Sequence, residues 1–190
     1  MGGFFGVTSD RDAVLDVFFG VDYHTHLGTR RGGMAAYDRE LGFQRDIHNI
    51  ENSPFRTKFA GITDEMRGNA CIACISDADP QPILIRSNLG TYAISELVAA
   101  MINQKSDFVD GIRFAQNIIK GTASILILRE DGSIIAARDK LGRIPVSIGR
   151  DADGHCVSFE TFAYQKLGYE KVRELGPGEI VSLTPHAMEV

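Results

Sequence analysis

The chain contains no tryptophan, only three cysteines and six prolines in 190 residues, and it has no long apolar run. No stretch approaches the ~18 apolar residues of a membrane-spanning helix, and no basic leader precedes an apolar stretch, so we expect neither a membrane protein nor a signal peptide. Three cysteines cannot form an even set of disulfides, which predicts a reduced, cytoplasmic protein. The net charge of -5 argues against nucleic acid or an anionic membrane as a partner.

The composition indicates a compact globular domain. Hydrophobic residues make up 44% of the chain and charged residues 24%, and a chain of this length can bury a sizeable core. No internal repeat and no low-complexity linker divides the sequence. We therefore expect residues 1–190 to form a single domain.

The apolar pattern predicts many short strands, with helices grouped in separate runs. Apolar stretches flank Asp131-Gly132, which is the strongest short signal for a β-hairpin. Residues 107–119 place apolar side chains on one stripe, as an amphipathic helix on a sheet would. Because strands and helices do not alternate strictly, the pattern predicts an α+β fold rather than a doubly wound α/β fold. Further strands are expected at 4–7, 34–37, 42–47, 70–76, 83–86, 91–94, 145–149 and 157–160, and further helices at 13–19, 52–59, 96–103 and 161–167.

Two pairs of residues could form metal or acid–base sites. Cys71 and Cys74 have C-x-x-C spacing, but strand alternation would put their thiols on opposite faces, so we expect plain buried cysteines. His24 and His26 share a face only on a strand, and no carboxylate or third histidine follows at the spacing of a site. Loop histidines are the simpler interpretation. We accordingly expect no metal ion and no cofactor.

The run from Lys120 to Val181 combines punctuated motifs in an uncommon order. They are Lys-Gly-Thr-Ala-Ser at 120–124, Arg-Asp-Lys-Leu-Gly-Arg-Ile-Pro at 138–145, Ser-Phe-Glu at 158–160 and Pro-Gly-Glu at 177–179. Two shorter motifs occur near the N-terminus, Gly-Phe-Phe-Gly-Val at 3–7 and Arg-Gly at 31–32. The order of these motifs, more than any one of them, is specific.

This order resembles the glutaminase domain of class II glutamine amidotransferases, and most closely that of amidophosphoribosyltransferase. The resemblance spans nearly the whole chain and is most specific in the C-terminal half. It implies the N-terminal nucleophile hydrolase fold, a four-layer αββα sandwich of two mainly antiparallel sheets. In that family the thiol of an N-terminal cysteine attacks the side-chain amide of glutamine, with the free α-amino group as base. The ammonia passes to a synthase domain such as a phosphoribosyltransferase.

Three parts of the family's site are missing from this sequence. Gly2 stands where the family has its cysteine, and glycine supplies an amine but no nucleophile. Ser76 stands where the family has an arginine that clamps the α-carboxylate of glutamine, and serine is too short and uncharged for that bidentate contact. The Asn-Gly of the oxyanion hole is absent, and Ser95-Glu96 follows at once, as though a segment had been removed. Deliberate engineering would explain the loss of the cysteine and of the segment, but it would not explain the loss of the arginine. We therefore favour natural loss.

The resemblance therefore predicts a glutaminase-type domain without catalytic residues. Arg31, Gly32 and Ser76 are the candidate ligand-binding residues, because a guanidinium beside a glycine-permitted backbone could hold glutamine or a related small anion. Alternatively, the Arg-Gly segment only shapes a tight loop. The expected function is an inactive amidotransferase domain related to an enzyme of purine biosynthesis. The alternative is a noncatalytic ligand-binding or assembly module that acts with a partner synthase or phosphoribosyltransferase domain.

Overall fold

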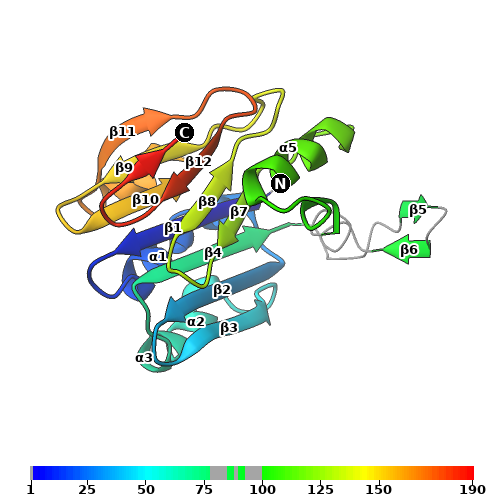
Figure 1. Ribbon diagram of the computed structural model, residues 1–190. Helices are drawn as coiled ribbons and strands as arrows, with labels where there is room; N and C mark the ends of the chain where they lie inside the picture. Colours follow the sequence, from blue (N-terminus) through cyan, green and yellow to red (C-terminus); the bar gives the residue numbers. More distant parts are fainter. Residues whose placement is uncertain (1, 78–84, 88–89, 93–99) are drawn as a thin grey trace.

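The computed structural model describes residues 2–77, 85–87, 90–92 and 100–190, which form mostly antiparallel strands (Figure 1). The strands are β1 (Gly2–Ser9), β2 (Arg31–Asp38), β3 (Gly42–Asn49), β4 (Ala70–Ser76), β5 (Ile85–Ser87), β6 (Gly90–Tyr92), β7 (Ile125–Leu128), β8 (Ile134–Ala137), β9 (Ser147–Arg150), β10 (Gly154–Ser158), β11 (Glu170–Glu174), β12 (Ile180–Leu183) and β13 (Met188–Glu189). The helices are α1 (Val14–Asp22), the 3₁₀ helix η1 (Thr25–Leu27), α2 (Phe55–Phe59), α3 (Ile62–Glu65), α5 (Phe108–Ile118) and α6 (Thr161–Gln165). No helix in these described ranges is long and apolar enough to cross a membrane.

The strand β1 lies at the centre of a seven-stranded sheet, whose order is β11-β9-β10-β1-β4-β2-β3. It pairs antiparallel with β10, where Phe5 is opposite Ser158, and with β4, where Gly2 is opposite Ser76. Almost all of β1 is buried. A strand covered on both faces needs apolar or small residues throughout, which explains the Gly-Phe-Phe-Gly-Val motif at 3–7.

A smaller sheet, in the order β13-β12-β8-β7, contains the predicted hairpin. Its turn includes Gly132 at a φ of 79°, a value that glycine adopts without strain. The N–H and hydroxyl of Ser133 donate to Asp131 Oδ1 at 2.9 and 2.6 Å, which closes the turn. The start of α5 is also determined by neighbouring residues, because the Asp107 carboxylate accepts hydrogen bonds from the first N–H groups of the helix.

Three apolar clusters mark the contacts between four layers. The first joins α1, α2 and α6 to one face of the large sheet, and includes Phe5, Val17, Phe55 and Tyr164. The second lies between the two sheets, and includes Phe4, Ile134, Val157 and Leu183. The third joins α5 to the outer face of the small sheet, and includes Ile112, Ala137 and Ile180. The layers follow the order helix, sheet, sheet, helix in Figure 1, so the predicted four-layer αββα sandwich is confirmed.

Most of the expected elements are present, with three differences. Arg31 and Gly32 belong to the strand β2 rather than to a tight loop. His24 lies between α1 and β2 as expected, but its side chain is fully buried. Cys71 is buried as expected, whereas Cys74 on the opposite face of β4 is exposed. The elements expected at 83–86, 91–94 and 96–103, and Ser95-Glu96, lie wholly or partly outside the described residues.

Candidate functional site

Three of the predicted site residues lie in one row across the large sheet. Gly2 of β1 is paired with Ser76 of β4, and Ser76 is paired with Arg31 of β2. Residues in register on neighbouring strands point to the same face. Here that face is the one toward the small sheet, because Phe4, two residues after Gly2, packs between the sheets. The row lies at the end of the sheet where β1 and β2 begin and β4 ends, near the N-terminal marker in Figure 1.

Gly32 lies on the opposite face, beneath the helices. It is paired with Ile75, whose side chain belongs to the cluster under α1 and α2. A Cβ atom at Gly32 would stand 2.8 Å from the Phe55 ring and 3.3 Å from the Phe59 ring. The structure therefore gives Gly32 a packing role, and a ligand contact for it stays a prediction.

The backbone at Gly2 has no room for a side chain. A Cβ atom built there would stand 2.6 Å from the carbonyl oxygen of Ile75. This distance is well inside ordinary carbon–oxygen contact, and the obstructing atom belongs to the backbone of a central strand, which cannot easily move aside. In this backbone, position 2 can therefore carry an amine but neither a cysteine nor a serine nucleophile.

The Gly28–Arg31 segment holds the end of β4 in place beside this row. Arg30 N–H donates to the Ser76 carbonyl at 3.0 Å, and the Thr29 N–H and hydroxyl donate to Asp77 Oδ1 at 3.1 and 3.2 Å. Arg31 is partly buried and has no ion-pair partner in the described part of the chain. Its guanidinium is thus the positive group of the row that remains available to an anion.

A buried histidine and serine lie under the start of β1, on the helix side of the sheet. His24 Nδ1 is 2.7 Å from the Gly20 carbonyl, and Nε2 is 3.0 Å from Ser158 Oγ. A carbonyl cannot donate, so Nδ1 carries the proton and the Ser158 hydroxyl donates to Nε2. Burial lowers the pKa of His24, which keeps the ring neutral. The His24 ring also lies below Gly3, where a Cβ would be 3.3 Å from the ring atom Cδ2, so the pair supports the strand from beneath.

His26 and Glu160 form a second, more exposed pair beside the first. His26 Nε2 is 3.0 Å from Glu160 Oε2, an ion-pair distance when the histidine is protonated. Neither pair was predicted from the sequence, since Ser158 and Glu160 are more than 130 residues away from the histidines. The only sequence signal for these pairs was the Ser-Phe-Glu motif at 158–160, and the sequence did not indicate that the two histidines contact it.

The nearest described thiol does not replace the missing nucleophile. Cys74 is paired with Phe4, so it is a diagonal neighbour of Gly2, roughly 7 to 8 Å away between Cα atoms. Desolvation by the neighbouring side chains raises the pKa of the Cys74 thiol, which disfavours the thiolate. Burial raises the pKa of Cys156 far above its usual value as well. The described thiols are therefore not activated for attack.

The Arg-Asp motif at 138–139, which carries much of the resemblance, is structural. The buried Asp139 carboxylate accepts hydrogen bonds from three backbone N–H groups, those of Ala123 (3.3 Å), Leu141 (3.1 Å) and Arg143 (3.4 Å). Arg138 donates to three backbone carbonyls, those of Gly142 (2.8 Å), Ile144 (3.0 Å) and Leu175. These contacts fix the connection from β8 to β9.

Comparison with known proteins agrees with this fold. No family model matches the chain. The amidophosphoribosyltransferase of Bacillus subtilis is 24% identical over 98% of this chain and 47% of its own length, and that of Mus musculus is 26% identical over 96% and 41%. The chain is a relative of the amidophosphoribosyltransferases. This amidotransferase-type domain spans about half the length of the curated relatives it matches.

Solved structures confirm the N-terminal nucleophile hydrolase fold of the amidotransferase-type domain. Glutamine phosphoribosylpyrophosphate amidotransferase from B. subtilis, complexed with ADP and GMP, has a TM-score of 0.79 at 24% identity. A structure described as the allosteric regulatory enzyme of purine biosynthesis has a TM-score of 0.80 at 22% identity. Each match covers 98% of this chain and 48% of the other. The sequence alignment with the B. subtilis relative extends over 226 positions, more than the 190 residues of this chain, so the relative carries segments that this chain lacks.

Proposed function

We propose that this amidotransferase-type domain keeps the glutaminase scaffold and does not hydrolyse glutamine. The observation that carries the proposal is Gly2. It occupies the first position of the central strand, it has no nucleophilic atom, and the Ile75 carbonyl occupies the place of any Cβ. A free α-amino group at this position could act as a base, but a base without a nucleophile cannot form the covalent intermediate of this chemistry.

The remaining role is binding. Arg31, unpaired within the described residues, and Ser76 beside it offer a site for glutamine or a related small anion at the row. Because its relatives are about twice as long, we further propose that the domain acts with a partner synthase or phosphoribosyltransferase domain in purine biosynthesis. The three free cysteines favour a reducing compartment such as the cytoplasm.

A glutaminase assay tests the loss of hydrolysis. The N-terminus of the purified protein is first established by mass spectrometry, so that a chain starting at Gly2 is assayed. We expect no glutamate or ammonia above a protein-free blank, with an active amidophosphoribosyltransferase as the positive control. Turnover by the wild-type chain that persists through repeated purification would overturn the proposal, whether or not Cys74→Ala abolishes it.

The variant Gly2→Cys makes the test sharper. If a missing sulfur were the only defect, this variant would gain activity. We expect it to stay inactive, because the new Cβ would meet the Ile75 carbonyl and Ser76 would still not clamp the substrate. Binding is measured separately by thermal shift with glutamine and glutamate, comparing the wild type with Arg31→Gln. A shift that Arg31→Gln does not reduce would contradict the site at the row.

A further inference from the structure

A cavity of about 330 Å³ lies between the inner face of the β2–β3 hairpin and β7. Its floor consists of two rows of paired residues on the large sheet, immediately next to the row of Gly2 and Ser76. The first row contains Ile47 of β3, Gly33 of β2, Cys74 of β4 and Phe4 of β1. The second row contains Arg45 of β3, Ala35 of β2 and Ile72 of β4. The opposite wall comes from Ser124 and Leu126, at β7. The cavity is distinct from the row that the proposed function uses, because none of Gly2, Arg31 and Ser76 lines it.

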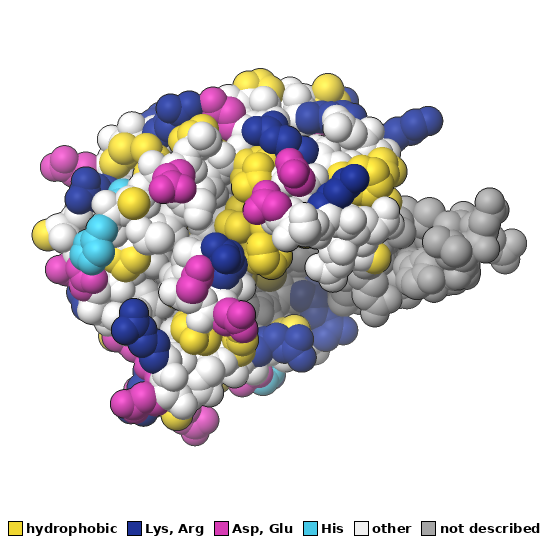
Figure 2. All heavy atoms as spheres, in the orientation of Figure 1, with side chains coloured by type: hydrophobic (Ala, Val, Ile, Leu, Met, Phe, Trp, Pro, Cys, Tyr) yellow, Lys and Arg dark blue, Asp and Glu magenta, His cyan; other side chains and the backbone are white. Residues whose placement is uncertain are grey.

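The cavity exists because the two sheets differ in width. The small sheet ends at β7, whereas the large sheet continues through β4, β2 and β3. The inner face of the β2–β3 hairpin therefore extends beyond the edge of the small sheet. Gly33 and Ala35 have little or no side chain, so the space above them stays unfilled. Figure 2 shows hydrophobic side chains exposed over β7, above the β2–β3 hairpin, with cationic side chains nearby. Ile47 on this face is 58% exposed, a high value for an isoleucine on a large sheet.

Two polar groups of the cavity have no hydrogen-bond or ion-pair partner among the described residues. Ser124 Oγ is buried and has no hydrogen-bond partner in the described parts of the chain, although buried hydroxyls are almost always hydrogen-bonded. Arg45 is exposed at the rim and has neither an ion pair nor a hydrogen bond with any described residue. An apolar cleft with a few convergent polar groups is the usual form of a small-molecule site. The unpaired guanidinium determines the charge of the ligand, because it attracts an anion.

We propose that this cavity binds a small monocarboxylic acid with an apolar body. The carboxylate pairs with Arg45, the Ser124 hydroxyl donates a further hydrogen bond, and the body packs on Ile47 and Leu126. Since a water occupies roughly 30 Å³, the volume suits a ligand of about ten non-hydrogen atoms. Glutamine does not fit this description, because the apolar walls would leave its ammonium and amide without partners.

Cys74 provides a built-in readout of occupancy. It lines the cavity and is exposed, whereas Cys71 and Cys156 are buried. Iodoacetamide should therefore modify Cys74 in the folded protein, at mildly alkaline pH because desolvation by the neighbouring side chains raises the pKa of this thiol. The probes are 3-phenylpropionate and hexanoate, each compared with its uncharged amide. We expect the acids to slow modification of Cys74 at least about fivefold at saturation, and the amides to act only at higher concentration.

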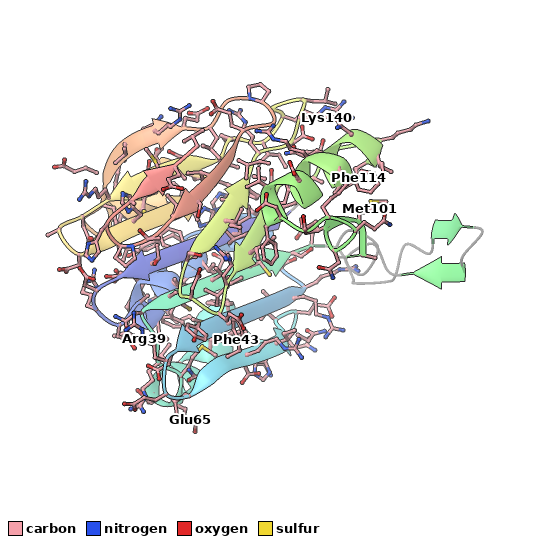
Figure 3. All side chains as sticks on the ribbon, in the orientation of Figure 1. Arg39, Phe43, Glu65, Met101, Phe114 and Lys140 are labelled. Carbon is pink, nitrogen blue, oxygen red and sulfur yellow. The ribbon has the colours of Figure 1, made fainter. Side chains whose placement is uncertain are left out.

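Three variants locate the effect. Arg45→Gln should weaken protection by the acids about fivefold, as loss of one exposed charged contact would. The matched control Arg39→Gln removes the same charge from the turn of the same hairpin, away from the cavity (Figure 3), and should change nothing. Gly33→Val should abolish protection by filling the cavity. A Cβ at Gly33 finds its nearest atom 3.4 Å away, an ordinary contact, so the strand can accept it.

The result separates this proposal from the proposed function, because Cys74 protection does not depend on glutamine hydrolysis. Equal protection by acid and amide, or equal loss in Arg45→Gln and Arg39→Gln, would overturn carboxylate recognition. Absence of protection by every acid in the folded wild type would overturn the site itself. If Gly33→Val does not fold, Ile47→Ser takes its place, since an exposed side chain can be shortened without unfolding the protein.

Discussion

Replacement of His24 by glutamine should change how the stability of this protein depends on pH. The His24 ring is fully buried, and burial is the largest of the effects that lower its pKa. The Gly20 carbonyl and the Glu160 carboxylate act in the opposite direction, and His26 adds a smaller effect that lowers the pKa further. The net result is a histidine that binds a proton less readily in the folded state than in the unfolded state.

The sign of the pH effect follows from this difference. A lowered folded-state pKa means that the unfolded chain takes up the proton first, as pH falls below the unfolded value of ~6.5. The contribution of His24 to stability is therefore complete above about pH 6.5 and decreases toward acid, until the folded-state pKa is reached. The slope cannot exceed about 1.4 kcal/mol per pH unit for one group.

The assay is urea unfolding at a series of pH values between roughly 7.5 and 5, with the free energy of unfolding extrapolated to water at each. The wild type should lose more stability toward acid than His24→Gln does. His24→Gln should be less stable at neutral pH by about 1 to 3 kcal/mol, because the buried contacts are imperfectly replaced, but its curve should be flatter. His186→Gln is the control, since it removes a histidine that is exposed and paired only with Asp10, and its curve should keep the wild-type slope.

Parallel curves for the wild type and His24→Gln would refute this reasoning. Such a result would mean that His24 takes up its proton equally in both states, and that the ring is not held neutral by burial. A His24→Gln curve that falls more steeply toward acid than the wild-type curve would refute it as well, because the contribution of His24 would then have the sign of a raised pKa.

Two further substitutions test the packing of the fold. Gly20→Ala should lower the free energy of unfolding by about 1 to 3 kcal/mol, although alanine is the better helix former by ~1 kcal/mol, because the new Cβ would stand 2.5 Å from the buried Phe5 ring. Urea unfolding checks it, and a variant more stable than the wild type would contradict it. Asp139→Ala should cost roughly 2 to 4 kcal/mol, because three backbone N–H groups lose their acceptor. Thermal unfolding should show the loss, and Asp139→Asn, which keeps one oxygen, should lose less.

The local elements of this protein could be predicted because neighbouring residues produce them. Asp131-Gly132 forms a hairpin turn through its own backbone conformation and the hydrogen bonds of Ser133. Asp107 begins α5 by accepting from N–H groups two and three residues later. The order of the sequence motifs, through their resemblance to the amidotransferase family, predicted the four-layer fold, and Gly2 led to the prediction that the family's nucleophile is missing.

The arrangement around the site required the tertiary structure. Residues 2, 31 and 76 became one row only through the register of three strands, and the same register placed Gly32 on the opposite face. His24 was interpreted as a loop residue because Ser158, which helps to bury it, is 134 positions away. The cavity beside β7 depends on the different widths of two sheets. Turn and helix signals act over a few residues, whereas pairing register and sheet width are set by contacts between distant parts of the chain, and a single sequence does not encode those contacts in a readable local pattern.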